Sequence, residues 1–167
     1  RFHQKSIKFV EGNILSFDHL QNIINDFQPH IIFHLAAEPL VSTGYEIPST
    51  VFQTNVVGTI NLLEACRTCN SIKSIVNVTT DKVYANCEQD FKFVETSPLG
   101  GDDPYSASKA CSELVTNSFY QSFFKACNIG VATARAGNVI GTGDFSANRL
   151  LPDVIRSAYS GSLLYIR

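Results

Sequence analysis

The chain has 167 residues, of which 44% are hydrophobic and 17% charged, as is typical of one globular domain with a sizeable core. The formal net charge of −2 provides no basic surface for nucleic acid. No apolar run is long enough to span a bilayer, and residues 1–5 lack the apolar core of a signal peptide. We therefore expect a cytoplasmic protein without nucleic-acid or membrane partners.

Short β-rich runs alternate along the chain with longer stretches of helical periodicity. The predicted strands cover residues 7–10, 31–35, 72–78, 130–134 and 163–166. The predicted helices cover residues 17–27, 50–66, 105–124 and 150–160. In the third helix, periodicity puts four residues on an apolar face: Ala110, Leu114, Val115 and Phe119.

This alternation implies parallel βαβ units, and hence an α/β fold with a Rossmann-like, doubly wound parallel sheet. The run 31–35 is apolar on both faces, as a strand covered by helices on both sides requires. In such sheets ligands bind outside the carboxyl ends of the strands. The loops expected there contain the most chemically distinctive residues, at 12–14, 36–38, 79–82 and 137–139.

The sequence contains no methionine, even at position 1, and no phosphate-binding Gly-x-Gly-x-x-Gly loop. We therefore expect a fragment of a longer protein, with a sheet incomplete at both ends and the first βα unit before Arg1. Without that loop a bound pyrophosphate has no helix N-terminus to neutralise it. We expect the fragment alone to be inactive.

Five cysteines are present, and an odd number without a secretory signal argues against a disulfide framework. Cys66 and Cys69 have the spacing of metal ligands, but no second Cys/His pair at zinc spacing accompanies them. We expect two reduced cysteines in or near the core, and no metal site.

Tyr105 and Lys109 lie four residues apart in a predicted helix, so they share one of its faces. A phenol with a pKa of ~10 is a poor base near neutrality, and a nearby cation favours its ionised form. The pair alone is also compatible with a half-buried tyrosine beside a solvated lysine. Its surroundings favour a catalytic role, because Thr80, Asp81 and Lys82 follow the preceding predicted strand.

Over essentially its full length the chain resembles the extended short-chain dehydrogenase/reductase family. Five motifs in the family's order carry the resemblance, at residues 34–37, 55–59, 78–84, 104–109 and 135–141. Within that family the chain resembles nucleotide-sugar 4,6-dehydratases, and among these the branch that acts on CDP-glucose. Three features carry this narrower likeness: Asp81-Lys82 after Thr80, the segment 98–104, and the segment 132–144.

The resemblance implies a lyase reaction with NAD as cofactor. Tyr105 would remove the proton of the sugar 4-hydroxyl, and Thr80 would position that oxygen. Lys109 would bind the nicotinamide ribose and depress the pKa of Tyr105. Asp81 would protonate the departing 6-hydroxyl after C4 oxidation has acidified the C5 proton. Lys82 would be either the C5 base or an electrostatic helper, since a lysine must be neutral to act as a base.

The resemblance also implies binding residues and a domain plan. Residues 1–167 would form a partial NAD-binding domain with the catalytic residues, the C-terminal substrate region being largely missing. The full-length protein would be a homodimer that binds a nucleotide sugar. The implied cofactor-binding residues, besides Tyr105 and Lys109, are Asn13, Ile14, Leu35, Ala36, Ala37 and Thr54. The implied substrate-binding residues are Asn138 and Arg149.

Other interpretations remain open from the sequence. A nucleotide-sugar 4-epimerase or another oxidoreductase of this family also needs Tyr105, Lys109 and Thr80, but only elimination of water needs an acid and a base after the threonine. A nucleotide-binding relative without activity would need none of these residues. Asn55 is compatible with a structural bridge between loops, and Arg135 with a buried ion pair.

Overall fold

The computed structural model of the chain describes residues 7–85, 90 and 92–164. One parallel sheet forms its centre, with strand order β1 (Ile31–His34), β2 (Ser74–Thr80) and β3 (Gly130–Ala136). Ile31 pairs with Ser74, and Ser74 pairs with Gly130, so the strands begin at one level and end at the same edge of the sheet. The parallel βαβ architecture predicted from the sequence is confirmed.

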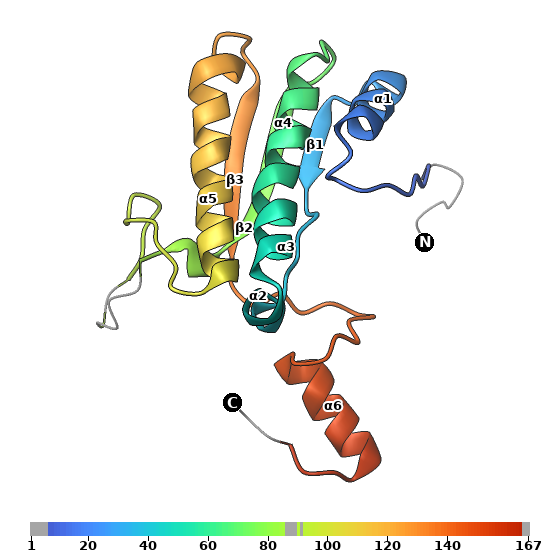
Figure 1. Cartoon of the computed structure of the whole chain (residues 1–167), viewed down its shortest axis with the longest axis vertical. Helices are drawn as coiled ribbons and strands as arrows, with labels where there is room; N and C mark the ends of the chain where they lie inside the picture. Colours follow the sequence, from blue (N-terminus) through green and yellow to red (C-terminus); the bar gives the residue numbers. More distant parts are fainter. Residues whose placement is uncertain (1–6, 86–89, 91, 165–167) are drawn as a thin grey trace.

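Helices connect successive strands and lie side by side against the sheet (Figure 1). Between β1 and β2 run α2 (Val41–Glu46), α3 (Pro48–Phe52), the π-helical segment η2 (Gln53–Val57) and α4 (Gly58–Arg67). Between β2 and β3 run the 3-10 turn η3 (Asp81–Val83), α5 (Pro104–Phe119) and the π-helical segment η4 (Tyr120–Phe124). Helices α1 (Phe17–Phe27) and α6 (Leu150–Ser160) have the predicted bounds, whereas α2 was not predicted. In the described ranges no helix is both long and apolar enough to cross a membrane.

The apolar core lies between the helices and the amino-terminal half of the sheet. Ile24 of α1, Leu63 of α4 and Ile75 of β2 are all at most 4% exposed and belong to one cluster. Cys66 and Cys69 are also buried there as free thiols, as predicted, while Cys87 lies outside the described residues. The opposite face of the sheet is open in the described part of the chain, where Ile31 and Phe33 are more than half exposed.

Two predicted strands are not formed in the described residues. Residues 7–10 carry no strand, and their apolar side chains are exposed. A β-rich run becomes a strand only when a neighbour satisfies its backbone hydrogen bonds, and the described sheet offers them no partner. At the other predicted strand, Leu163 and Leu164 are irregular, and residues 165 and 166 lie outside the described residues.

The apolar face predicted for the helix 105–124 is wrong at one position. Ala110 is buried, but Leu114 is 59% exposed. The side of α5 that faces the sheet is polar instead, and its buried residues include Ser108, Lys109, Ser112, Glu113 and Thr116. These polar residues of α5 are buried because β2 offers them partners: Asn77 donates to Ser112 and Thr116, and Thr79 donates to Glu113.

Candidate active site

The candidate site lies where β2 ends and α5 begins. Asp103 caps α5 by accepting a hydrogen bond of 3.0 Å from the Ser106 backbone N–H, and Pro104 occupies the first turn. Gly101 has φ +124°, and a Cβ there would lie 2.6 Å from the backbone N of Ala107. Only glycine therefore allows the preceding loop to lie so close to the turn that carries Tyr105.

Lys109 lies one turn further along α5 and is only 5% exposed. Its Nζ donates a hydrogen bond of 2.9 Å to the Val78 carbonyl, near the end of β2. Burial lowers the pKa of Lys109 to about 8, against an opposing effect of the Glu113 charge. His34 is buried nearby, where burial and the Lys109 charge lower its pKa to about 4, so that its imidazole is neutral at physiological pH.

Tyr105 shows the opposite pKa direction to the one expected. Burial raises the pKa of Tyr105 above 10, and a hydrogen bond with the Thr80 side chain and the Arg149 charge oppose this rise only in part. In this structure Lys109 donates to Val78 and burial has the largest effect on the phenol, so the lowering of the Tyr105 pKa by Lys109 stays a prediction.

Thr80, Asp81 and Lys82 form a compact turn next to Tyr105. The Thr80 hydroxyl donates to the Asp81 carboxylate at 3.1 Å, and the Lys82 backbone N–H lies 3.4 Å from the Thr80 Oγ1. Thr80 is buried, whereas Asp81 and Lys82 are exposed. Asp81 and Lys82 line a cavity of about 380 Å³ together with Tyr84, Phe93, Gly101, Asp102, Asp103 and Ser106. An acid and a lysine therefore line one accessible cavity, and Thr80 and Tyr105 are not among the residues that line it.

The loop after β1 is held at the same edge of the sheet. Asn55, buried in the π-helical segment, accepts from the Glu38 backbone N–H at 2.8 Å and donates to the Glu38 carbonyl at 3.2 Å. It also donates to the Ser108 hydroxyl of α5 at 2.8 Å, which confirms the bridging role considered from the sequence. Three predicted cofactor residues precede this bridge: Leu35 and Ala36 are exposed, and Ala37 is partly buried.

The remaining predicted cofactor residues lie at the start of the chain and in η2. Asn13 accepts a hydrogen bond of 2.9 Å from the Leu15 backbone N–H, so its side chain shapes its own turn. Ile14 packs against Gly58, where an added Cβ would lie 2.8 Å from the Ile14 Cγ2. Thr54 is partly buried in the π-helical segment.

The two predicted substrate residues follow β3 and differ in position. Arg149 precedes α6, forms an ion pair of 3.3 Å with Asp144, and lies close enough to Tyr105 for its charge to lower the phenol pKa. Asn138 is solvent-exposed in the loop directly after β3. The structure therefore places Arg149 near the Tyr105 phenol, whereas Asn138 lies in an exposed loop.

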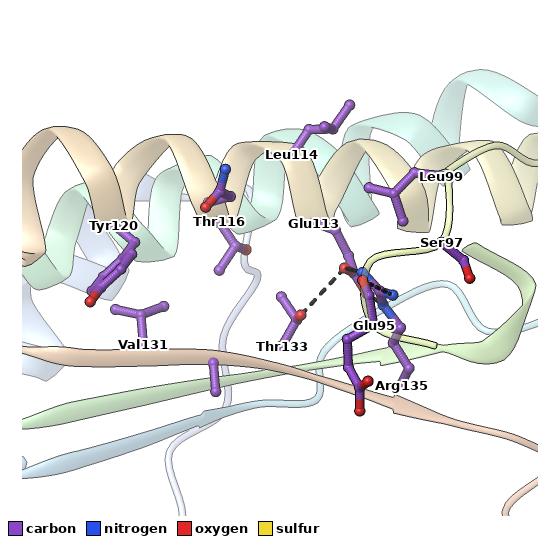
Figure 2. Close-up of a pocket in the computed structure, with 12 residues that line it drawn as sticks. Glu95, Ser97, Leu99, Glu113, Leu114, Thr116, Tyr120, Val131, Thr133 and Arg135 are labelled. Atoms are coloured by element: carbon purple, nitrogen blue, oxygen red, sulfur yellow. Dashed lines mark hydrogen bonds and ion pairs between the residues drawn. The ribbon is translucent and has the colours of Figure 1, made fainter. Parts of the chain in front are cut away.

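One residue of the site neighbourhood was not singled out in the sequence. Glu113 accepts hydrogen bonds from the Thr79 hydroxyl at 2.6 Å, from Arg135 Nε at 2.8 Å, and from Thr133 at 3.3 Å. Figure 2 shows its carboxylate reaching from α5 toward Arg135 and Thr133 on β3, in the wall of a cavity of about 310 Å³. Its spacing of four residues from Lys109 was the signal that could have identified it.

Charge holds this cluster together. Arg135 Nη2 lies 2.5 Å from Glu113 Oε2, with side-chain exposures of 15% and 4%, which confirms the expected buried ion pair. Burial alone would raise the pKa of Glu113, but hydrogen bonds from Arg135 and Thr79 outweigh it and hold that pKa below its ordinary value. Glu113 is therefore ionised and fixed in place.

A family model described as GDP-mannose 4,6 dehydratase matches residues 1–160. The CDP-glucose 4,6-dehydratase of Salmonella typhimurium is 47% identical over 161 residues, covering 93% of this chain and 45% of that protein. A dTDP-glucose 4,6-dehydratase of Xanthomonas campestris is 34% identical over 164 residues, covering 93% of this chain and 45% of that protein.

Solved structures share the fold. A double mutant of the dTDP-glucose 4,6-dehydratase of Streptomyces venezuelae, crystallised with NAD, superposes with a TM-score of 0.86 at 28% identity. The match covers 97% of this chain and 48% of that one, so the chain spans about half the length of the relatives it matches. The predicted Rossmann-like fold is confirmed. Both the family model and relatives more than 30% identical cover most of the chain, which therefore belongs to the GDP-mannose 4,6 dehydratase family.

Proposed function

We propose that the full-length protein is an NAD-dependent nucleotide-sugar 4,6-dehydratase, a lyase, with CDP-glucose as its favoured substrate. The observation that carries the proposal is the hydrogen bond from Thr80 to Asp81 beside Tyr105. It puts a carboxylic acid next to the two residues, Thr80 and Tyr105, that would act on the sugar 4-hydroxyl. The 47% identity to a protein named CDP-glucose 4,6-dehydratase supports the choice of substrate.

The residues present fit NAD at the carboxyl edge of the sheet. The exposed Ala36 adds little bulk there, Asn55 holds its loop by hydrogen bonds, and the buried Lys109 donates to the Val78 carbonyl near the same edge. We assign Asn13, Ile14, Leu35, Ala37 and Thr54 to the same cofactor surface. When bound, NAD supplies reversible oxidation, accepting a hydride from sugar C4 and returning it to C6.

Each protein residue then has a defined task. Tyr105 takes the proton of the 4-hydroxyl, and Thr80 orients that oxygen through its own hydroxyl. Because the pKa of Tyr105 is raised by burial, proton removal depends on positive charge placed near the phenol, for which Lys109 and Arg149 are the candidates. Asp81 protonates the leaving 6-hydroxyl. Lys82 faces the same cavity as C5 base or as electrostatic helper.

We propose that Asn138 and Arg149 bind the nucleotide diphosphate. Arg149 supplies a guanidinium that suits phosphate oxygens, and it lies on the side of the site where α6 begins. Asn138 supplies amide donors from the loop after β3.

The test is incubation of the full-length protein with NAD and CDP-glucose, followed by measurement of the alkali-induced absorbance of a 4-keto sugar. The proposal predicts this absorbance and a 6-deoxy product. Formation of CDP-galactose instead would identify a 4-epimerase. Asp81→Asn should lower the yield of deoxy product by about 100-fold, since general acid catalysis contributes that order. An unchanged yield would remove Asp81 from the mechanism.

We further propose that the full-length enzyme is a cytoplasmic homodimer. Outward-facing apolar residues on the adjacent helical segments support the dimer: Phe52, Val57, Ile60, Leu114 and Phe123 are each at least 36% exposed. Free cysteines and the proposed cofactor agree with the cytoplasm. Light scattering of the full-length protein should give twice the monomer mass, and Leu114→Glu should reduce it to the monomer mass.

A further inference from the structure

The last three residues of β2 each lie against a residue of α5. The Val78 carbonyl accepts from Lys109 and the Thr79 hydroxyl donates to Glu113, while Thr80 lies beside Tyr105. The three α5 partners are spaced four residues apart, so one face of the helix contacts three consecutive residues of the strand.

The contact between Thr79 and Glu113 is fixed by further hydrogen bonds to the Glu113 carboxylate. Thr79 is 6% exposed, and its hydroxyl lies 2.6 Å from a carboxylate oxygen that Arg135 Nε also contacts, at 2.8 Å. The second carboxylate oxygen is held by Arg135 Nη2 and by the Thr133 hydroxyl. Four hydrogen bonds thus hold the two oxygens of the buried Glu113 carboxylate, and Thr79 donates to a fixed acceptor.

We propose that Thr79 is a positioning residue: its hydroxyl, held by Glu113, sets the position of the neighbouring Thr80 relative to Tyr105, so that both reach the same substrate oxygen. Hydrogen-bonded groups in a catalytic site must keep their geometry closely, and a displacement of about 1 Å can cost on the order of 100-fold in rate. In this role Thr79 acts through Thr80, the next residue of the strand.

Two hydroxyls on the same carboxylate provide a matched control. Thr79 and Thr133 both donate to Glu113, but Thr79 lies on β2 beside Thr80, whereas Thr133 lies on β3. A role limited to stabilising Glu113 predicts that loss of either hydroxyl acts in the same way. A role in positioning Thr80 predicts that only the loss at Thr79 affects turnover.

The experiment compares four full-length proteins: wild type, Thr79→Val, Thr79→Ser and Thr133→Val. The measurements are kcat, KM for CDP-glucose and thermal unfolding. Thr79→Val keeps the side-chain shape and should lower kcat by about 10- to 100-fold with little change in KM, because the lost geometry matters mainly in the transition state. Thr79→Ser retains the hydroxyl and should restore kcat to within about 3-fold of wild type. Thr133→Val should have the wild-type kcat.

The inference rests on the proposed function, and the wild-type arm separates their failures. If the wild type does not dehydrate CDP-glucose, the proposed substrate is wrong, and the same variants are then compared by reduction of NAD with whichever nucleotide sugar is turned over. If the wild type is active and folded Thr79→Val keeps its kcat, Thr79 has no positioning role. An equal loss of kcat in Thr133→Val, or no recovery in Thr79→Ser, would also overturn the proposal.

Discussion

Replacing Glu113 by glutamine in the full-length protein should be one of the most destabilising single changes in this domain. The ion pair with Arg135 has oxygen–nitrogen distances of 2.5 and 2.8 Å, and the Glu113 side chain is 4% exposed. Removing one charge of a buried pair leaves the other desolvated and unpaired, which costs about 3–5 kcal/mol. Because domains are stable by only about 5–15 kcal/mol, this loss is a large fraction of the total.

An exposed ion pair serves as the control. Arg156 and Asp153 in α6 also form a guanidinium–carboxylate contact, but their side chains are 44% and 35% exposed. Water screens such a pair, so Asp153→Asn should cost at most about 1 kcal/mol. Urea unfolding at neutral pH measures both free energies of unfolding. If Glu113→Gln costs no more than Asp153→Asn, burial is not what makes the Glu113 pair strong, and the reasoning fails.

A double variant and a pH series test the cause. Glu113→Gln with Arg135→Met removes both charges, and it should be more stable than the sum of the two single losses predicts. The folded-state pKa of Glu113 is below its ordinary value of 4.5, so its contribution to stability is present above pH 4.5. That contribution is lost as pH falls through the lower folded pKa, and Glu113→Gln should lack this part of the acid dependence.

Three further outcomes are expected of the full-length protein. The folded pKa of Lys109, about 8, lies below its ordinary 10.5, so the free energy of unfolding should rise by about 3 kcal/mol between these pH values, and Lys109→Met should lose that rise in urea titrations. Gly101→Ala, at φ +124°, should cost about 1–3 kcal/mol in thermal unfolding, while Gly141→Ala, with no atom within 4 Å, should change stability by less than about 1 kcal/mol. Asn55→Ala should weaken NAD binding by about 10-fold by calorimetry, because losing the two bonds to Glu38 frees the cofactor loop. Wild-type values for Lys109→Met, Gly101→Ala or Asn55→Ala would contradict the respective argument.

The local part of the fold was predictable from periodicity and turn residues. Helices Phe17–Phe27 and Leu150–Ser160 have the predicted bounds, and left-handed residues end both, at Gln28 and Gly161. The predicted helix 50–66 is instead interrupted by η2, whose Asn55 is buried and bonded to Glu38 and Ser108. Those partners lie 17 and 53 residues away, so no local pattern could indicate the interruption.

The candidate site also has a part that was predictable from local sequence and a part that depends on distant contacts. Helical spacing put Tyr105 and Lys109 on one face, and strand order put Thr80 at the same edge of the sheet. The direction of the Tyr105 pKa could not be predicted, because desolvation depends on the burial that the whole fold creates. The role of Glu113 was not predicted, because it depends on contacts with Thr79, 34 residues earlier, and with Arg135, 22 residues later.

The polar interface explains why α5 forms although it is rich in serine and threonine, which favour helices only weakly. Its inward hydroxyls find fixed partners instead of competing with the backbone. Asn77 of β2 donates to Ser112 at 2.9 Å and to Thr116 at 2.8 Å, and the Ser112 hydroxyl lies 3.0 Å from that of Thr59. Thr59 in turn lies 3.0 Å from the buried imidazole of His34.

The interface between β2 and the helices thus changes along the strand from apolar to hydrogen-bonded. The buried residues at alternate positions of β2 are Ile75, Asn77 and Thr79, so the contact with the helices is apolar where the strand begins and hydrogen-bonded where it ends. Apolar contact stabilises without fixing direction, whereas hydrogen bonds are directional. The strand therefore uses the directional contacts at the end that carries Thr80, where the proposed chemistry requires a defined distance to Tyr105.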